Sequence, residues 1–276
     1  MRRAGNPVVA PRSSSLLALR ARGAGSLADE SAPKFERRTA KSEQPSIRLV
    51  EVPTLHAWDV TVPEAIEIQR QLRARLVTSP PPGFAPRLAA GADLSMEKGS
   101  DRAHAGIVVL EVESLRTVEE VTGDVALRFP YVPGLLSFRE LPAVVEAWAR
   151  LERRPDVLLF DGVGYAHPRR FGLACHGGVL LDVPSIGCAK SILVGRHGPL
   201  ADERGATAPL VDKGEVVGVA LRTRAGVSPV YVSIGHRMDL DTAVDIVLRL
   251  TTRYREPETT RRAHQLVNRL RREAKG

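Results

Sequence analysis

A chain of 276 residues can bury a substantial hydrophobic core, and we predict one folded domain preceded by a tail. The net charge of +8 makes an anionic partner plausible, although an arginine-rich composition alone can account for part of it. No apolar run reaches the roughly 18 residues of a membrane-spanning helix, so no membrane partner is expected. Cys175 and Cys188 form no C-x-x-C pair, which argues against disulfides and zinc and favours the reducing cytoplasm.

The segment before Pro45 is rich in Arg, Ala, Ser, Gly and Pro and has no sustained hydrophobic period. Such a segment cannot bury enough surface to offset the entropy lost on ordering. We therefore predict a disordered basic tail over residues 1–45 and a single domain over residues 46–276. The first acidic residue is Asp29, so an organelle transit peptide, a start codon placed too far upstream and a plain basic tail all remain open.

The first half of the domain predicts a helix followed by strands. Residues 64–76 have helical character, with Thr61 as a cap and Pro63 in the first turn, and the prolines at 80–82 end the helix. Three extended runs rich in Val, Ile, Leu and Thr then predict an antiparallel meander. These runs are residues 88–94, 104–113 and 115–122.

The second half predicts a mixed α/β arrangement. Residues 156–160 are short and uniformly apolar, as in a buried central strand that ends at Asp161. Ligands bind at such strand ends in α/β sheets. The other expected elements are helices over residues 141–153, 172–181, 240–254 and 258–274, a strand over 184–188, and a hairpin of 216–223 with 229–234.

An aromatic residue stands between two prolines at Pro130, Tyr131 and Pro133. Each proline fixes its own φ and favours extended geometry in the residue before it, so the ring is expected on a stiff, exposed loop. Glu140 follows the loop closely. A rigid wedge beside a carboxylate suits an enzyme that separates stacked bases and cuts the strand. The alternative is a rigid surface turn.

Carboxylates follow several of these elements. We expect Asp93 to end one apolar strand and Asp161 another, with Glu140 after the proline loop. Carboxylates converging from separate elements would suit Mg²⁺ or Mn²⁺, which prefer oxygen ligands. Taken singly, each acid is more often a cap, a turn residue or a surface charge. Spacing alone does not establish that they meet.

Six motifs follow one another along the chain: Gly91-Ala92-Asp93, Pro130 to Glu140, Phe160-Asp161-Gly162, Ala166-His167-Pro168-Arg169, Gly187-Cys188-Ala189-Lys190 and Gly235-His236-Arg237. In these motifs and their order the chain resembles endonuclease V, a nuclease for deaminated purines, over roughly residues 60 to 250. The resemblance implies a ribonuclease H-like α/β fold, with a mixed central sheet flanked by helices. It also implies a DNA-repair endonuclease that uses Mg²⁺, or Mn²⁺ as a substitute, and we expect the protein to be a monomer. The expected cut is at the second phosphodiester bond 3′ to deoxyinosine in DNA, leaving a 3′-hydroxyl and a 5′-phosphate.

The same resemblance implies roles for the catalytic residues. Asp93 and Asp161 match metal-binding aspartates, and Glu140 matches a catalytic glutamate that would share the metal. Lys190 would act electrostatically on the attacked phosphate. His236 would be a fourth metal ligand or a proton carrier.

Further residues are expected to bind the substrate. Tyr131, between Pro130 and Pro133, would fill the gap left by the flipped nucleotide. Gly134, Leu135 and Leu136 would line the base pocket, where backbone groups would read the edge of hypoxanthine. The remaining pair, His167 and Arg169, would contact phosphate or order water.

Other interpretations remain. Inosine-containing RNA is a competing substrate, and a non-catalytic nucleic-acid-binding module is the competing class of protein. A hydrolase using Cys175 with His176, or Ser185, is disfavoured because adjacent helical residues point in different directions. Val163 stands where the family usually has a polar residue, which makes the hydrogen bonding around Asp161 uncertain.

Overall fold

The structure, a computed structural model, describes residues 52–96 and 101–273. The chain divides into two units, Met1–Pro45 and Ser46–Gly276, and the predicted tail over residues 1–45 lies outside the described residues. The helices are α1 (Val62–Arg73), α2 (Leu136–Ala149), α3 (Leu173–Leu181), α4 (Leu240–Arg249) and α5 (Glu258–Glu273). The strands are β1 (Leu88–Met96), β2 (Arg102–Glu111), β3 (Thr117–Ala126), β4 (Val157–Phe160), β5 (Ser185–Ala189), β6 (Thr207–Asp212), β7 (Glu215–Leu221) and β8 (Val230–Ile234).

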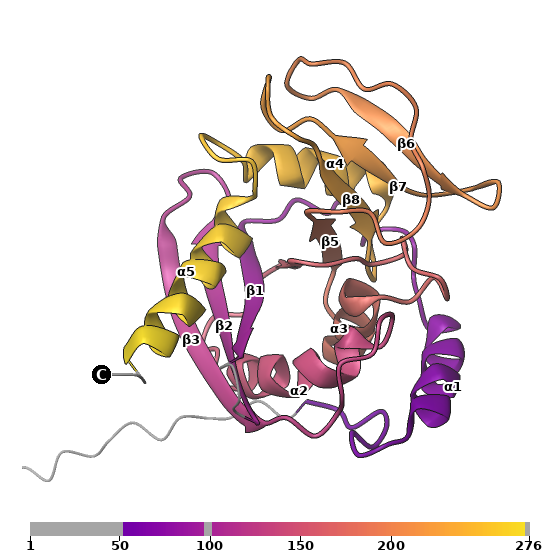
Figure 1. The fold of residues 1–276 in the computed structure, drawn as a ribbon. Coiled ribbons are helices and arrows are strands. Elements are labelled where there is room, and N and C mark those ends of the chain that lie inside the picture. Colours follow the sequence, from indigo (N-terminus) through magenta and orange to yellow (C-terminus); the bar gives the residue numbers. More distant parts are fainter. Residues whose placement is uncertain (1–51, 97–100, 274–276) are drawn as a thin grey trace, which may run out of the picture. The chain divides into compact units, whose positions relative to one another are not determined.

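Within the described residues, eight strands form one mixed sheet in the order β3-β2-β1-β4-β5-β8-β7-β6 (Figure 1). The predicted meander is confirmed as β1, β2 and β3, and the predicted hairpin as antiparallel β7 and β8. The neighbours β1, β4 and β5 run parallel to one another. Because parallel strands end at the same edge of a sheet, whatever follows β4 and β5 lies at one edge, beside the last residues of β1.

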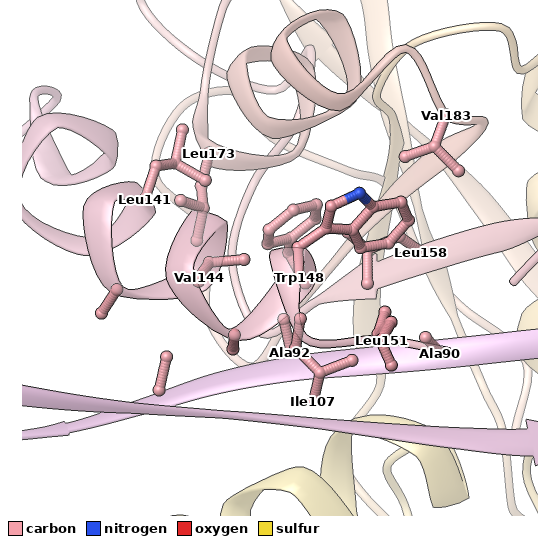
Figure 2. Close-up of a cluster of buried hydrophobic side chains, with 14 of the residues drawn as sticks. Ala90, Ala92, Ile107, Leu141, Val144, Trp148, Leu151, Leu158, Leu173 and Val183 are labelled. Carbon is pink, nitrogen blue, oxygen red and sulfur yellow. The ribbon is translucent and has the colours of Figure 1, made fainter. Parts of the chain in front are cut away.

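Helices cover both faces of the sheet, because successive strand residues point to opposite sides. On one side Ile107 and Val109 of β2 belong to the largest part of the core, which includes Trp148 of α2 (Figure 2). On the other side Val108 and Leu110 pack with Ala263 and Leu266 of α5. The sheet is therefore held between α2 and α5.

A glycine permits α5 to lie directly on β1. A Cβ atom built on Gly91 would come within 2.2 Å of the backbone carbon of Thr259, far inside contact distance. Only a residue without a side chain allows so close an approach. Gly91 and Asp93 are two residues apart in β1, so both lie on the face that α5 covers.

Several expected boundaries were wrong. Helix α2 begins at Leu136 instead of residue 141, which places Glu140 inside the helix, and α4 ends at Arg249 instead of residue 254. Strand β6 was not predicted, because Pro209 weakens its strand pattern; as the last strand of the sheet order, it can accommodate a proline. No described helix is both long enough and apolar enough to cross a membrane.

Candidate active site

Two aspartates lie side by side at the shared strand edge. Ala92 of β1 is in register with Phe160 of β4, so the next residues, Asp93 and Asp161, are also neighbours. Asp161 follows the last residue of β4, as predicted. Asp93 does not end its strand, because β1 continues to Met96. The parallel pairing of β1 and β4 therefore brings together two acids that are far apart in the sequence.

Glu140 interacts with both aspartates from α2. Dense packing around its carboxyl group, followed by repulsion from Asp93 and Asp161, raises the pKa of Glu140 to about 8. Burial also raises the pKa of Asp93, and Asp161 adds to the increase, although a hydrogen bond from His264 opposes it. The three acids are thus close enough to repel one another electrostatically, and a cation bound among them would be favourable.

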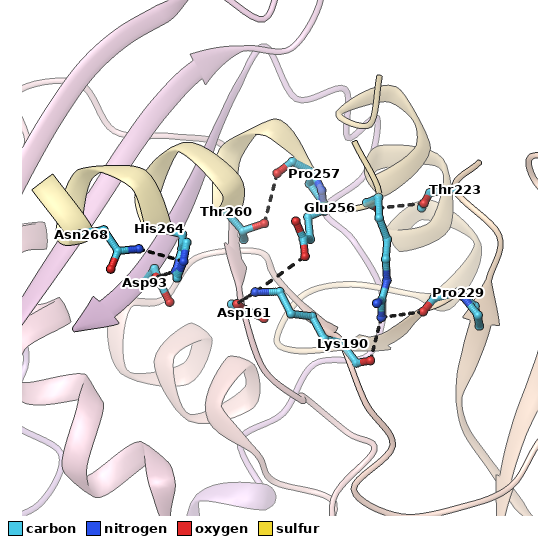
Figure 3. Close-up of polar contacts among 11 residues, drawn as sticks. Asp93, Asp161, Lys190, Thr223, Pro229, Glu256, Pro257, Thr260, His264 and Asn268 are labelled. Carbon is cyan, nitrogen blue, oxygen red and sulfur yellow. Dashed lines mark hydrogen bonds and ion pairs between the residues drawn. The ribbon is translucent and has the colours of Figure 1, made fainter. Parts of the chain in front are cut away.

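Lys190 neutralises one of these acids. It follows β5, next to the end of β4, and its Nζ donates a hydrogen bond to Asp161 Oδ2 at 2.6 Å (Figure 3). Burial is the largest single influence and would lower the pKa of Lys190, but the bond to Asp161 and the nearby negative charges together outweigh it, so the pKa is raised. A second acid, Glu256, lies 3.8 Å from the same nitrogen. The lysine is therefore charged and held at the strand edge beside the acids, and its action on a phosphate stays a prediction.

His264 of α5 contacts the other aspartate and was not predicted. Its Nδ1 donates to Asp93 Oδ2 at 2.8 Å, and Asn268 Nδ2 donates to its Nε2 at 2.8 Å (Figure 3). Thr260, His264 and Asn268 are spaced four residues apart, which places them on one helix face. This polar stripe in an arginine-rich helix was the available signal in the sequence.

The acids do not form a closed metal site. Among the described residues, no three His, Cys, Asp or Glu side chains are grouped so that they could hold a metal ion. Asp93 and Asp161 instead use their Oδ2 atoms to accept bonds from His264 and Lys190. The chemistry of the donors still fits Mg²⁺ or Mn²⁺, because carboxylate oxygens are the preferred ligands of both ions. Metal binding by Asp93, Glu140 and Asp161 stays a prediction.

His236 lies at the opposite edge of the sheet. Strand β8 runs antiparallel to β5, and Ile234 pairs with Ile186 near the start of β5, whereas Lys190 follows its end. Five strand residues span about 16 Å. The ring of His236 accepts a bond from the Val77 N–H at 3.3 Å and lies 3.4 Å from Asp182. The expectation that His236 reaches the acids was therefore wrong, because the strand before it runs away from them.

A pocket of about 120 Å³ adjoins the acids through Gly162, the residue after Asp161. Tyr131 at its rim is 69% exposed, as expected for a ring held on a proline-stiffened loop. Leu135 does not line the pocket as expected, because it is buried in a cluster with Phe129 and Phe138. The lining residues are Gln69, Tyr131, Val132, Pro133, Gly134, Leu136, Ser137, Gly162, Val163, His167, Gly172, Leu173 and Leu193.

Three side chains brace the pocket loop by donating to the carbonyl oxygen of Gly134. The donors are Gln69 Nε2 at 3.1 Å, His167 Nε2 at 2.9 Å and Arg169 Nη2 at 2.6 Å. The glycine has φ +80°, a conformation that favours glycine. Through these bonds His167 and Arg169 hold the loop, and their expected contact with phosphate or water stays a prediction. They also engage the Gly134 carbonyl oxygen, so its expected contact with a base stays a prediction.

Other sequence expectations concern residues around this pocket. Pro130 is exposed beside Tyr131, and Val163 lies in the pocket wall and packs against the buried cluster of Ala166, Leu210 and Val217. Cys175 is fully buried, and burial raises the pKa of its thiol to about 12. The Ser185 hydroxyl donates to the Ala174 carbonyl. Neither residue has the activated, accessible nucleophile that a cysteine or serine hydrolase needs.

Known proteins share both the sequence and the fold. Residues 70–265 match the family model of endonuclease V. Endonuclease V of Myxococcus xanthus is 63% identical over 220 residues, which cover 80% of this chain and 94% of that protein. The crystal structure of the Streptomyces avermitilis endonuclease V is 44% identical, with a TM-score of 0.76 over 80% of this chain and 97% of that one.

A more distant relative was crystallised with nucleic acid. Endonuclease V of Ciona intestinalis, in complex with a 24mer DNA containing an inosine followed by a ribo-adenosine, is 27% identical, with a TM-score of 0.68. The match covers 77% of this chain and 98% of that chain. The predicted ribonuclease H-like fold, a mixed sheet with flanking helices, is thereby confirmed. The chain belongs to the endonuclease V family and is a hydrolytic nuclease that acts on DNA.

Proposed function

We propose that this protein is a metal-dependent endonuclease that recognises deoxyinosine in DNA. It hydrolyses the second phosphodiester bond 3′ to the lesion and leaves a 3′-hydroxyl and a 5′-phosphate. The observation that carries the proposal is the junction at Asp161 and Gly162, where one residue belongs to the acidic cluster and the next lines the pocket. The inosine-containing DNA in the Ciona intestinalis complex supports the same substrate class.

Asp93, Glu140 and Asp161 would hold Mg²⁺, with Mn²⁺ as a substitute. The ion would supply Lewis-acid stabilisation of the phosphate and a more acidic water. Lys190 lies within hydrogen-bond distance of Asp161, so its ammonium group can also face a phosphate oxygen at the strand edge. His264 holds Asp93 in a fixed orientation through the bond to Oδ2.

Tyr131 acts as the wedge. A flipped nucleotide leaves a gap in the stack, and unstacking costs a few kcal/mol, less for a mismatched base. The exposed phenol ring can fill that gap while the base enters the pocket beside it. The bonds to Gly134 keep the loop stiff, so little ordering is needed on binding.

The test compares matched DNA and RNA strands, each with one inosine, in Mg²⁺, in Mn²⁺ and in EDTA. We expect a nick in DNA at the second phosphodiester bond on the 3′ side, and none in EDTA or in a strand with adenosine. Cleavage of the RNA alone would instead establish a ribonuclease. Tight binding without cleavage in either metal would establish a binding module.

We further propose that the enzyme acts as a monomer in the cytoplasm. Both Cys175 and Cys188 are buried free thiols, as suits a reducing compartment. Light scattering of the purified protein tests the monomer, and a dimer at micromolar concentration would contradict it.

A further inference from the structure

A chain of hydrogen bonds runs from the pocket wall through the buried His176 to the half-buried His56. Ser137 lines the pocket and is 2% exposed, and its Oγ lies 2.9 Å from Nδ1 of His176. Nε2 of His176 lies 2.8 Å from Nε2 of His56. Nδ1 of His56 lies 2.7 Å from the carbonyl oxygen of Ala57. None of these contacts belongs to the acidic cluster.

The last contact sets the direction of the whole chain. A carbonyl oxygen only accepts, so His56 Nδ1 carries a proton. Burial lowers the pKa of His56, and burial together with His56 lowers that of His176 well below its usual range. With both rings neutral, His56 Nε2 has no proton and must accept from His176 Nε2. His176 Nδ1 is then bare and accepts the proton of the Ser137 hydroxyl.

Packing fixes the rings in this arrangement. The His176 ring stacks on Trp58, with 5.8 Å between ring centroids, and meets Phe138 edge-on at 5.1 Å. His56 contacts the same two residues. Neither imidazole can turn over without disturbing this cluster. The Ser137 hydroxyl therefore donates its proton to His176, and its oxygen can only accept a hydrogen bond from any further partner.

The other buried polar side chains of the pocket are already engaged. Gln69 donates both protons of its amide, to Gly134 and Phe171, and accepts from Arg169. His167 donates to Gly134 and accepts from the backbone N–H of Arg169. Tyr131 lies mostly in solvent. Among the lining side chains, Ser137 is thus left as the buried acceptor.

We propose that Ser137 Oγ accepts the N1–H of hypoxanthine, and that His176 and His56 hold the hydroxyl in this acceptor role. The inference rests on the proposed function and adds a determinant of base choice. Hypoxanthine has a proton on N1, whereas adenine has a bare N1 that would face a lone pair of Ser137. The hydrogen-bond chain from Ser137 through His176 to His56 keeps Ser137 an acceptor, and two facing acceptors are unfavourable because an unpaired buried acceptor is costly. Ser137 would therefore reject the undamaged base as well as bind the damaged one.

The test measures equilibrium binding without divalent metal. The probes are strands with one deoxyinosine, or one deoxynebularine, whose purine ring has no N1 proton. S137A should weaken binding of the inosine strand about tenfold and change binding of the nebularine strand less than about twofold. Comparing the two bases isolates the N1 contact from general damage to the pocket.

A second variant removes His176, which accepts the Ser137 proton. H176F keeps an aromatic ring but leaves the Ser137 hydroxyl free to donate to a bare N1. It should therefore weaken inosine binding and strengthen nebularine binding. S185A, which loses a buried hydroxyl at the far sheet edge, is the control: it should lower the melting temperature and leave the base preference unchanged. Equal losses for both bases in S137A would overturn the inference. Wild type without inosine preference would instead overturn the proposed function.

Discussion

The acidic cluster and the base pocket meet at Asp161 and Gly162, and burial affects them in opposite ways. In the cluster it acts on negative groups and raises the pKa of Glu140 to about 8. In the pocket it acts on a basic group, because burial followed by the charge of Arg169 lowers the pKa of His167 to about 4. Under the proposed function, the first region would hold a cation and the second a neutral base, so the same desolvation would suit two different ligands.

The largest expected effect tests the raised pKa of Glu140 in the acidic cluster. Its pKa rises from 4.5 in the unfolded chain to about 8 on folding, so the native state binds more protons between these values. Without divalent metal, the free energy of unfolding should fall as pH rises through this window, by on the order of 5 kcal/mol. E140Q should reduce this dependence of the unfolding free energy on pH. Urea unfolding in EDTA at several pH values measures it, and an unchanged slope in E140Q would refute the assignment.

Asp161 tests the catalytic half of the cluster. D161N should reduce nicking of an inosine duplex by about 10³-fold, which is the scale of losing a main electrostatic group. Binding of the same duplex without metal should change little, because the pocket is intact. D182N, an acid at the opposite sheet edge, should keep nearly full activity. Residual cleavage within tenfold of wild type would contradict the role of Asp161.

His167 tests the pocket, where the pKa shift and the expected pH dependence of stability are opposite to those of Glu140. Its pKa falls from 6.5 in the unfolded chain to about 4 on folding, so the unfolded state binds more protons in this range. Stability should be complete above about pH 6.5 and decline as pH falls towards 4, by on the order of 3 kcal/mol. H167Q should weaken this acid sensitivity. H197Q, outside the pocket, should not, and a similar effect from both would argue against the Gly134 brace.

Tyr131 gives the smallest expected effect. Y131A should weaken binding of an inosine duplex about tenfold, because one ring-base stacking contact is lost. Its melting temperature should stay close to wild type, since the ring is mostly exposed. Y131F keeps the ring and should bind nearly as well as wild type. If Y131A preferred inosine duplexes as strongly as wild type, the wedge would be excluded.

The parts that sequence could predict are those set by local pattern. A short apolar run before Asp161 predicted the central strand β4, whereas the parallel pairing with β1 that places Asp93 beside Asp161 was seen only in the structure. Lys190 followed from its motif and the strand before it. These residues lie at or near strand ends, where the position of the side chain depends on few choices of topology.

Contacts between distant elements were not predictable. His264 lies 171 residues after Asp93, and only the packing of α5 on β1 brings them together. His236 was assigned to the site from its motif, but the antiparallel direction of β8 moves it away. The brace on Gly134 depends on side chains from two distant segments, Gln69 of α1 and the loop that carries His167 and Arg169. A residue's motif gives its neighbours in sequence, whereas these roles depend on strand direction and helix docking.

Gly91 has no reactive atom, yet it sets the spacing of the active site. The backbone of α5 occupies the place where any larger residue would put its first carbon. An alanine there would push the helix outwards, and His264 would move away from Asp93 with it. Loss of catalysis from such a change would resemble loss of a ligand, although every reactive group remained. The inert position two residues before an acid thus works as a spacer for the chemistry.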